Sequence, residues 1–381
     1  MANQQVAPAR THGAAVRAHC RGLLLAAMCA AAMGCAHAGS WDRELQACGG
    51  LDNEAPTYRL ASRPGLRGDL ALNQGFRIDG VDYRAAMTAR PMGGGSDAPA
   101  GMDIRQLYLE GKGYGLAPDT ALWAGRRLLL RTDTRVVERF VTDLSGVGAG
   151  LDAPLGSARL GLSYFGTDGN AIDAGSRLNL DVHEIGTLPG GRLRLVGTLT
   201  QGSVPHGTRG LGLIAMHTQD RLLGRASHTL WLAYAQGSAG LDGNFGGLGD
   251  PASVRSWRVV QSLGVQAGVF GGQTMLLWEH HRRDASSDMR ALLAGRATFA
   301  PGRNFKLVGE LAHARLRPQG AQLQALTRAT LAPTLSVGRG RDPRTELSLY
   351  AGHVHGSVAA GQALDGLPAD SRYGAHVLLW F

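Results

Sequence analysis

The fold class is decided by the last nine residues, Tyr373-Gly374-Ala375-His376-Val377-Leu378-Leu379-Trp380-Phe381. Side chains of an extended chain alternate between two faces. Tyr373, Ala375, Val377, Leu379 and Phe381 therefore share one face, and the residues between them share the other. An apolar face of this kind that ends on an aromatic residue is typical of strands in outer-membrane barrels, where one face meets lipid.

Runs with the same period of two recur along the chain, between turn signals such as Asp79-Gly80 and Pro301-Gly302. Strands of about nine residues or more cross a bilayer at a tilt, a length that a soluble β-sandwich or propeller rarely needs. We predict an all-β protein, a transmembrane antiparallel β-barrel of 16 or 18 strands, because single-chain barrels have even counts. A degenerate strand at 34–41 would add one to about sixteen visible runs, and the even count would then require one more. The clearest runs are 81–90, 104–114, 157–165, 177–185, 192–200, 210–216, 228–236, 257–267, 274–281, 290–299, 305–315, 322–331 and 346–353.

The amino end has the order of an export signal. Arg10, Arg17 and Arg21 precede an apolar stretch at 23–33, and Ala36-His37-Ala38 is a small-x-small cleavage pattern. We predict a cleaved signal peptide at 1–38 and a barrel domain at 39–381, located in the cell outer membrane. Lipoprotein processing at Cys35 is the alternative.

Composition excludes several classes of protein. No apolar run of 18 residues follows residue 38, so no transmembrane helix is expected. Three of the four cysteines precede residue 38, which excludes a disulfide scaffold and leaves Cys48 as a lone thiol. Removal of residues 1–38 removes three arginines and no acids, so the net charge falls from +9 to +6. Basic residues without interleaved aromatics do not favour a nucleic-acid partner.

Four motifs follow one another in the first third: 105–112 (RQLYLEGK), 122–127 (LWAGRR), 131–133 (RTD) and 143–151 (DLSGVGAGL). In this order and spacing the chain resembles the maltoporin (sugar porin) family. Tyr58-Arg59-Leu60, His217-Thr218-Gln219 and the end at Leu379-Trp380-Phe381 are similar to further stretches of that family.

The resemblance implies a homotrimeric channel of about 18 strands, with 16 possible, for passive diffusion of small solutes, above all sugars and oligosaccharides, and not an enzyme. It implies no cofactor. A loop at about 131–148 would fold inward and narrow the pore. The partners it implies are sugars or other small solutes, outer-membrane lipid and the barrel-assembly machinery, which would read Phe381. By resemblance, the solute path and constriction are assigned to Arg59, Asp69, Arg105, Arg131, Asp133, Arg135, Glu138, Phe140 and Trp380.

Some positions depart from the family's pattern. Arg67 and Gly356 stand where aromatics that guide sugars are expected, and residues 92–101 contain no aromatic. The alternative function is therefore a general or anion-leaning porin that has lost sugar selectivity. This alternative rests on a cluster of five arginines: Arg126, Arg127, Arg131, Arg135 and Arg139. The cluster would give the constriction a positive charge that favours anions. The other interpretation is that these arginines form a solvated loop face.

Other sequence patterns give no reason to expect a metal site, a phosphate-binding loop or a catalytic nucleophile. His353 and His355 share a strand face but have no third ligand nearby in the sequence, so we predict no metal site. The stretch 146–150 (GVGAG) lacks the Lys-Ser/Thr pair of a phosphate-binding loop, and we interpret it as tight turns. No Ser, His and acid pattern matches a nucleophile motif, which gives no reason to expect catalysis.

Overall fold

A computed structural model describes the barrel domain, within one compact unit that spans Asp42–Phe381. The described residues are 45–50, 65–92, 101–115, 117–133, 140–167, 174–202, 207–222, 224–284, 286–320, 322–337, 345–356 and 370–380. The predicted signal peptide, the predicted strand at 34–41 and Phe381 lie outside them. Among the described residues, no helix is long and apolar enough to span a bilayer.

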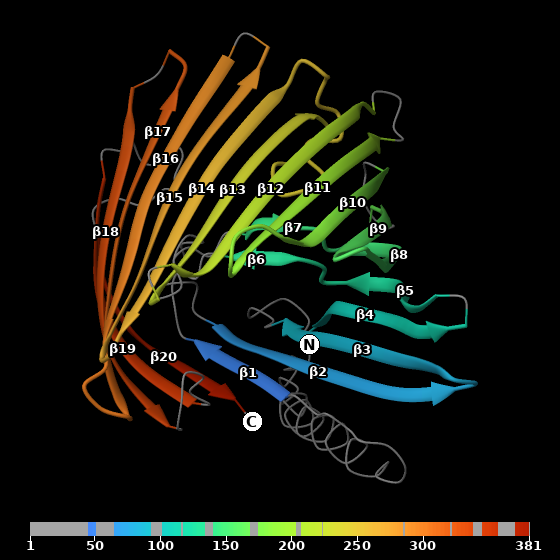
Figure 1. Cartoon of the computed structure of the whole chain (residues 1–381). Coiled ribbons are helices and arrows are strands. Elements are labelled where there is room, and N and C mark those ends of the chain that lie inside the picture. Colours follow the sequence, from blue (N-terminus) through green and yellow to red (C-terminus); the bar gives the residue numbers. More distant parts are fainter. Residues whose placement is uncertain are drawn as a thin grey trace, which may run out of the picture. The chain divides into compact units, whose positions relative to one another are not determined.

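The described chain is built of β-strands (Figure 1). In chain order they are β1 (Leu45–Gly50), β2 (Gly65–Ile78), β3 (Val81–Met92), β4 (Gly101–Tyr114), β5 (Ala117–Arg127), β6 (Arg131–Asp133), β7 (Phe140–Asp143), β8 (Gly146–Leu155), β9 (Ala158–Gly166), β10 (Gly175–Gly186), β11 (Gly191–Gly202), β12 (Arg209–Leu222), β13 (Ala226–Gly237), β14 (Arg255–Ala267), β15 (Phe270–Arg283), β16 (Ser286–Phe299), β17 (Phe305–Pro318), β18 (Gln324–Val337), β19 (Thr345–Gly356) and β20 (Asp370–Trp380). All thirteen predicted runs overlap these strands closely.

Eighteen of the strands form one antiparallel sheet in which sequence neighbours pair. β5 pairs with β8, and β6 and β7 form a separate two-stranded sheet. β1 pairs with both β2 and β20, so each strand of the large sheet has two hydrogen-bonded neighbours and the ladder closes on itself. The all-β barrel prediction is confirmed, with 18 strands rather than 16.

The first strand is not where the sequence pattern placed it. The position beside β20 is taken by Leu45–Gly50 instead of residues 34–41, and Ala47 pairs with both Gly68 and Leu379. Cleavage after Ala38 would delete most of a strand at 34–41, whereas it leaves β1 intact.

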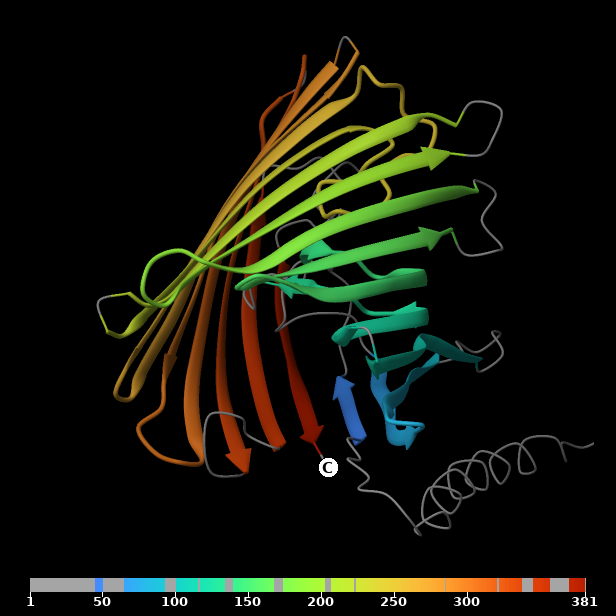
Figure 2. The ribbon, with the colours of Figure 1, turned by 45° about the vertical axis from the view of Figure 1, so that its right-hand side comes forward.

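The two faces of the sheet differ as a membrane wall requires. On the outer face, Leu180, Leu213 and Leu311 are about half exposed, whereas residues one position away, such as Asn179, Ile214 and Ala312, are buried. Alternation of this kind follows from the strand period of two. Figures 1 and 2 show the strands side by side around a common interior.

The two ends of the barrel are distinguished by their connections. Short turns join β2 to β3 at Asp79-Gly80 and β8 to β9 at Gly156-Ser157. The start of β1 and the end of β20, which pair at Gln46 and Trp380, lie at this same end of the barrel. Long connections, including 128–145 and 238–254, lie at the other end. In outer-membrane barrels short turns are periplasmic and long connections are external.

The prediction of tight turns at 146–150 is wrong, because these residues open strand β8. Gly148 pairs with Gly125 of β5 and Phe165 of β9, and Gly150 pairs with Trp123 and Ser163. A Cβ at Gly150 would lie 2.8 Å from the indole nitrogen of Trp123. The glycines are thus needed to make room for inward-facing aromatic rings, not to turn the chain.

Candidate functional site

The connection between β5 and β8 folds into the barrel. Within it, β6 and β7 form a hairpin in which Arg131 pairs with Asp143 and Thr132 with Thr142. Val141 is 3% exposed and packs in one cluster with Trp231, Met275 and Leu277 of the inner wall. The inward-folded constriction loop is therefore confirmed, although it spans 128–145 rather than 131–148.

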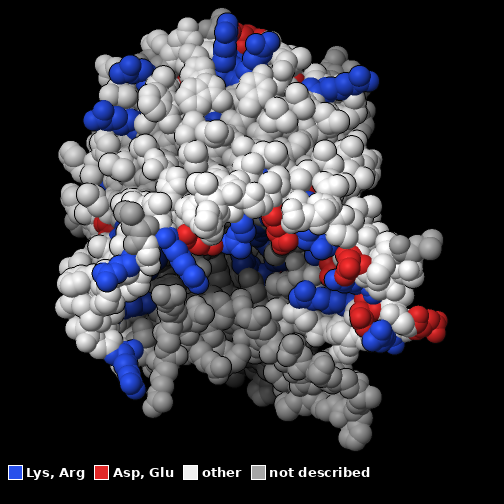
Figure 3. All heavy atoms as spheres, viewed as in Figure 1, with Lys and Arg blue, Asp and Glu red and all other residues white. Residues whose placement is uncertain are grey.

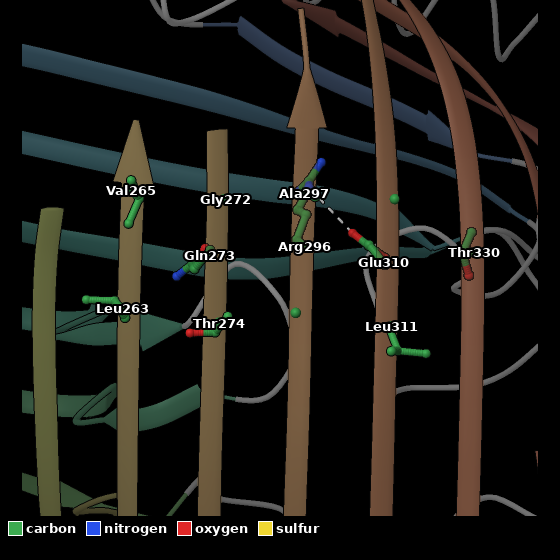
Figure 4. Close-up of a pocket in the computed structure, with 12 residues that line it drawn as sticks. Leu263, Val265, Gly272, Gln273, Thr274, Arg296, Ala297, Glu310, Leu311 and Thr330 are labelled. Atoms are coloured by element: carbon green, nitrogen blue, oxygen red, sulfur yellow. Dashed lines mark ion pairs between the residues drawn. The ribbon is translucent and has the colours of Figure 1, made fainter. Parts of the chain in front are cut away.

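The hairpin packs against an apolar patch of the inner wall, which we call the apolar seat. Ladder register places inner-face residues of β14–β17 at one level, in the order Val260, Leu277, Leu292 and Ala314. A charged row, Arg258, Glu279 and Arg290, lies toward the external end. A polar row, Gln273, Arg296, Glu310 and Thr330, lies toward the periplasmic end, where Arg296 and Glu310 form an ion pair of 3.5 Å (Figure 4). The seat thus fixes the hairpin at mid-height between two polar rows.

A second connection, 238–254 between β13 and β14, also folds inward. The amide of Asp143 donates to the carbonyl of Asp242 at 2.8 Å, which joins the two connections directly. Leu144 is fully buried against Ala239 and Leu241 of the second connection. Sequence analysis missed this connection, because its glycine-rich stretch has no period and no aromatic signal.

Arg177 of β10 holds both connections against the wall. Its guanidinium donates to the carbonyls of Leu144 at 3.0 Å and Ser145 at 2.9 Å, and to the carbonyl of Gly243 at 3.2 Å. The same group stacks on Phe165, 4.3 Å from the ring centroid. Arg177 is 1% exposed. Because Arg presents several donors in a fixed plane, one side chain can satisfy carbonyls from two segments.

The carbonyl of Gly243 accepts one of the three Arg177 bonds. Its carbonyl also accepts from the amide of Asn179 at 3.0 Å. Its φ of +84° lies in the left-handed region that favours glycine, and a Cβ there would lie 2.5 Å from the Leu144 side chain. The tight turn at Gly243 therefore depends on the absence of a side chain.

A buried charge cluster supports the hairpin from the external side. Glu279 is fully buried and binds Arg258 at 2.5 Å and His281 at 2.6 Å. His281 also contacts the hydroxyl of Ser256 at 2.8 Å. Arg258 donates to the carbonyl of Val141 at 3.4 Å, so the cluster reaches the hairpin. Nearby, burial raises the pKa of Asp242 in the second connection, while Arg258 opposes the rise.

Of the residues assigned from the resemblance, Arg131 lies in the hairpin, and Arg105, Asp69 and Trp380 lie on strands of the wall. Arg131 pairs with Asp143 at 3.1 Å inside the hairpin. Arg105 lies at a β-bulge of β4 and pairs with Asp103 at 3.3 Å. Asp69 of β2 and Trp380 of β20 both pair with Gln46 of β1, which brings their backbones to one level. Outside the described part lie Arg59, Arg135 and Glu138, together with the side chains of Asp69, Asp133, Phe140 and Trp380.

The arginine cluster is partly neutralised. Arg127 binds Glu110 at 2.7 Å and lies 4.7 Å from the ring centroid of Tyr108. Arg131 has Asp143. Arg135 and Arg139 lie outside the described residues. Among the described side chains no group of three or more His, Cys, Asp and Glu could hold a metal ion.

A cavity of about 390 Å³ lies between the hairpin and the inner wall. Trp231 borders it, and its indole N–H is buried without a hydrogen-bond partner among the described residues. Most of the remaining lining carries hydroxyl or amide groups: Thr132, Thr218, Ser227, Thr229, Ser262 and Gln273.

Comparison with known proteins identifies the family. The family model described as LamB porin matches residues 33–381. The chain belongs to the LamB porin family. It is accordingly a porin, an outer-membrane β-barrel channel, as its inward-folded constriction and closed ladder also indicate.

Individual members and neighbours of this porin are more distant. Maltoporin 1 of Aeromonas salmonicida is 35% identical over 72 residues, which are 18% of this chain and 17% of that protein. Maltoporin of Hahella chejuensis is 34% identical over 117 residues, 28% of this chain and 27% of that protein. The matched segments thus span about a quarter or less of these relatives.

Solved structures agree on the fold. OccD3 (OpdP) of Pseudomonas aeruginosa has a TM-score of 0.53 at 11% identity, covering 89% of this chain and 90% of that one. Wzi, a carbohydrate-binding outer-membrane β-barrel of Escherichia coli, has a TM-score of 0.53 at 12% identity, covering 90% and 84%. At such identities the likeness concerns the barrel fold.

Proposed function

We propose that this porin passes small neutral solutes, sugars and oligosaccharides above all, by passive diffusion. The observation that carries the proposal is the cavity beside the hairpin, where the unpaired indole N–H of Trp231 meets a wall of hydroxyl and amide groups. Sugars present hydroxyls that both donate and accept, and such a lining can exchange hydrogen bonds with them. Several weak contacts in series favour passage over trapping.

The charge pattern of the described lumen supports a neutral solute. Arg127 is paired with Glu110 and Arg131 with Asp143, while Arg258 and Arg290 share Glu279. Arg194 and Asp181 form a further close pair on the inner wall. Paired charges create little net field along the path, whereas an anion-selective filter uses unbalanced Arg or Lys rings. The anion-leaning porin is the second candidate, favoured only by the surplus of arginine in the sequence.

Planar-bilayer conductance with sugar titration tests the proposal. Trp231→Phe keeps a ring and removes the N–H, and one neutral hydrogen bond is worth about 0.5–1.5 kcal/mol. We expect sugar block to weaken roughly 2- to 12-fold, since about 1.4 kcal/mol is tenfold. Trp278→Phe is the control, because Trp278 lies on the outer face and is 46% exposed. Absence of sugar block in the wild type, with an anion-selective reversal potential, would favour the second candidate.

The proposal extends to assembly. We infer a homotrimer, export by a signal peptide at 1–38, and recognition of Phe381 by the barrel-assembly machinery. Chemical cross-linking of purified protein tests the trimer. The yield of Phe381→Ala in the outer membrane tests the terminal signal, and a wild-type yield would remove it from the proposal.

A further inference from the structure

Four arginines form a band on the outer face of β14–β17 near the external end. Arg255 of β14 pairs directly with Arg282 of β15 in the ladder. Arg315 and Arg317 lie on β17, where their neighbours Ala314 and Leu316 are buried on the inner side. All four are exposed. We call these four residues the outer arginine band.

Aromatic side chains fix the depth of this band. Trp257 lies two residues along β14 from Arg255, on the same face, and its ring is 5.9 Å from His280 and 6.3 Å from Trp278. Tyr234 of β13 pairs with Trp257 and continues the row. Aromatic girdles of barrels lie at the edge of the hydrocarbon. Arg255 and Arg282 lie two residues beyond this row on the external side, at the depth of outer-leaflet headgroups. The ladder register places Arg317 level with Trp257 and Arg315 level with Trp278.

The band has an unbalanced charge. Arg255 and Arg282 stand opposite each other, and like charges in that arrangement destabilise a sheet. Within the described chain, none of the four arginines forms an ion pair with Asp or Glu. The acids of this end are engaged elsewhere, because Asp250 pairs with Arg283 at 2.7 Å and Asp284 accepts from Ser253 at 2.7 Å. In Figure 3, Lys and Arg, with Asp or Glu beside some of them, lie along the upper margin, and further charged residues lie in the lower half of the view.

The guanidinium geometry indicates the class of anion. Two arginines side by side can bind one phosphate through parallel N–H···O bonds, an arrangement that Arg favours for phosphate and carboxylate. The Nε of Arg315 donates to Nε2 of His313 at 2.9 Å, which orients the guanidinium. A ligand that reaches this depth beside an apolar wall must itself carry acyl chains, because the surface below the band is hydrocarbon-facing.

We propose that the outer arginine band binds the phosphate headgroup of an outer-leaflet lipid. The lipid's acyl chains lie along the leucine-rich outer wall below the aromatic row, and its phosphate neutralises Arg255 and Arg282. Arg315 and Arg317 engage a second phosphate or a second lipid molecule. The site lies outside the solute path.

Native mass spectrometry of the full barrel in detergent tests this, with bis-phosphorylated lipid A as the probe. We expect wild type to retain the lipid and Arg255→Gln with Arg282→Gln to bind it at least about tenfold more weakly, a change of about 1.4 kcal/mol. Arg221→Gln with Arg303→Gln is the matched control, because both residues are exposed at the short-turn end. Conductance of each variant reports that the barrel is folded.

Three outcomes overturn the proposal. Equal binding by the band variant and the control variant removes the arginines from the site. Equal binding of dephosphorylated lipid A removes the phosphate. Displacement of the lipid by millimolar inorganic phosphate identifies a free-anion site instead. If the Gln variant fails to fold, Arg255→Lys with Arg282→Lys keeps the charge, and retained binding that falls with added salt supports the proposal.

Discussion

At the scale of single residues, Arg177 holds two inward-folded connections against the barrel wall. One guanidinium satisfies carbonyls from two chain segments that lie 33 and 66 residues away in sequence. Replacement by Met keeps the length and removes every donor, so three buried carbonyls lose a charged partner. Hydrogen bonds to charged groups contribute about 1.5–3 kcal/mol each.

We therefore expect Arg177→Met to lower the free energy of unfolding by about 2–4 kcal/mol and to make the single-channel current noisier. Urea unfolding in detergent and current recordings measure the two effects. Arg192→Met is the control, because Arg192 forms an exposed pair with Asp220 that contributes at most about 1 kcal/mol. Equal effects of the two substitutions would contradict the role assigned to Arg177.

Asp242 makes the second connection sensitive to pH. Burial raises its pKa above the ordinary value, so the folded state favours the protonated acid. Its contribution to stability is present below the ordinary pKa of the carboxyl and is lost as the pH rises through the raised value. The folded position of the second connection should therefore be more stable at acidic pH than at neutral pH.

We expect wild-type channels to show fewer spontaneous conductance fluctuations at pH 4 than at pH 7, and Asp242→Asn to be quiet at both. The Asn side chain has the shape of the protonated acid and does not titrate. Asp250→Asn serves as a control from the same connection, since Asp250 pairs with Arg283 of the wall. A pH response that survives Asp242→Asn would assign the effect to another group.

At the scale of elements, the hairpin is an addition to the wall rather than part of it. Arg127 of β5 pairs with Gly146 of β8 directly, so the ladder does not need β6 and β7. Replacement of residues 131–143 by a short Gly-Ser linker should therefore leave a folded barrel with a wider path. We expect single-channel conductance to rise and sugar block to weaken, while shortening the turn at 300–304 should change neither. Unchanged conductance would place the constriction elsewhere.

The strands could be predicted from the sequence, whereas the contacts between distant segments could not. Strands such as 290–299 and 305–315 were predicted because alternation is a local property that each segment displays alone. The hairpin was located through resemblance. The seat of Val141 and the bonds of Arg177 were not predictable, because they depend on which distant strands face each other across the interior. The β8 glycines were misinterpreted for the same reason, since their purpose is set by Trp123 on the neighbouring strand.

At the scale of the whole molecule, the position of β1 constrains the mature amino terminus. The strand begins at Leu45, so processing after Ala38 leaves a short lead before the wall. We expect the intact mass of protein purified from outer membranes to begin at Gly39. Of the four cysteines only Cys48 would remain, and unfolded protein should react with one equivalent of maleimide. A start beyond Leu45, or two reactive thiols, would contradict this.

The pairing of β1 with β20 joins the first and last strands of the domain at one seam. A chain that stops before β20 leaves β1 and β19 each with one unpaired edge, and exposed strand edges recruit other chains. Closure of the barrel wall therefore requires that translation and export of the whole chain are complete. A premature stop codon near the 3′ end of the message should accordingly yield material for periplasmic proteases rather than a smaller, leaky pore.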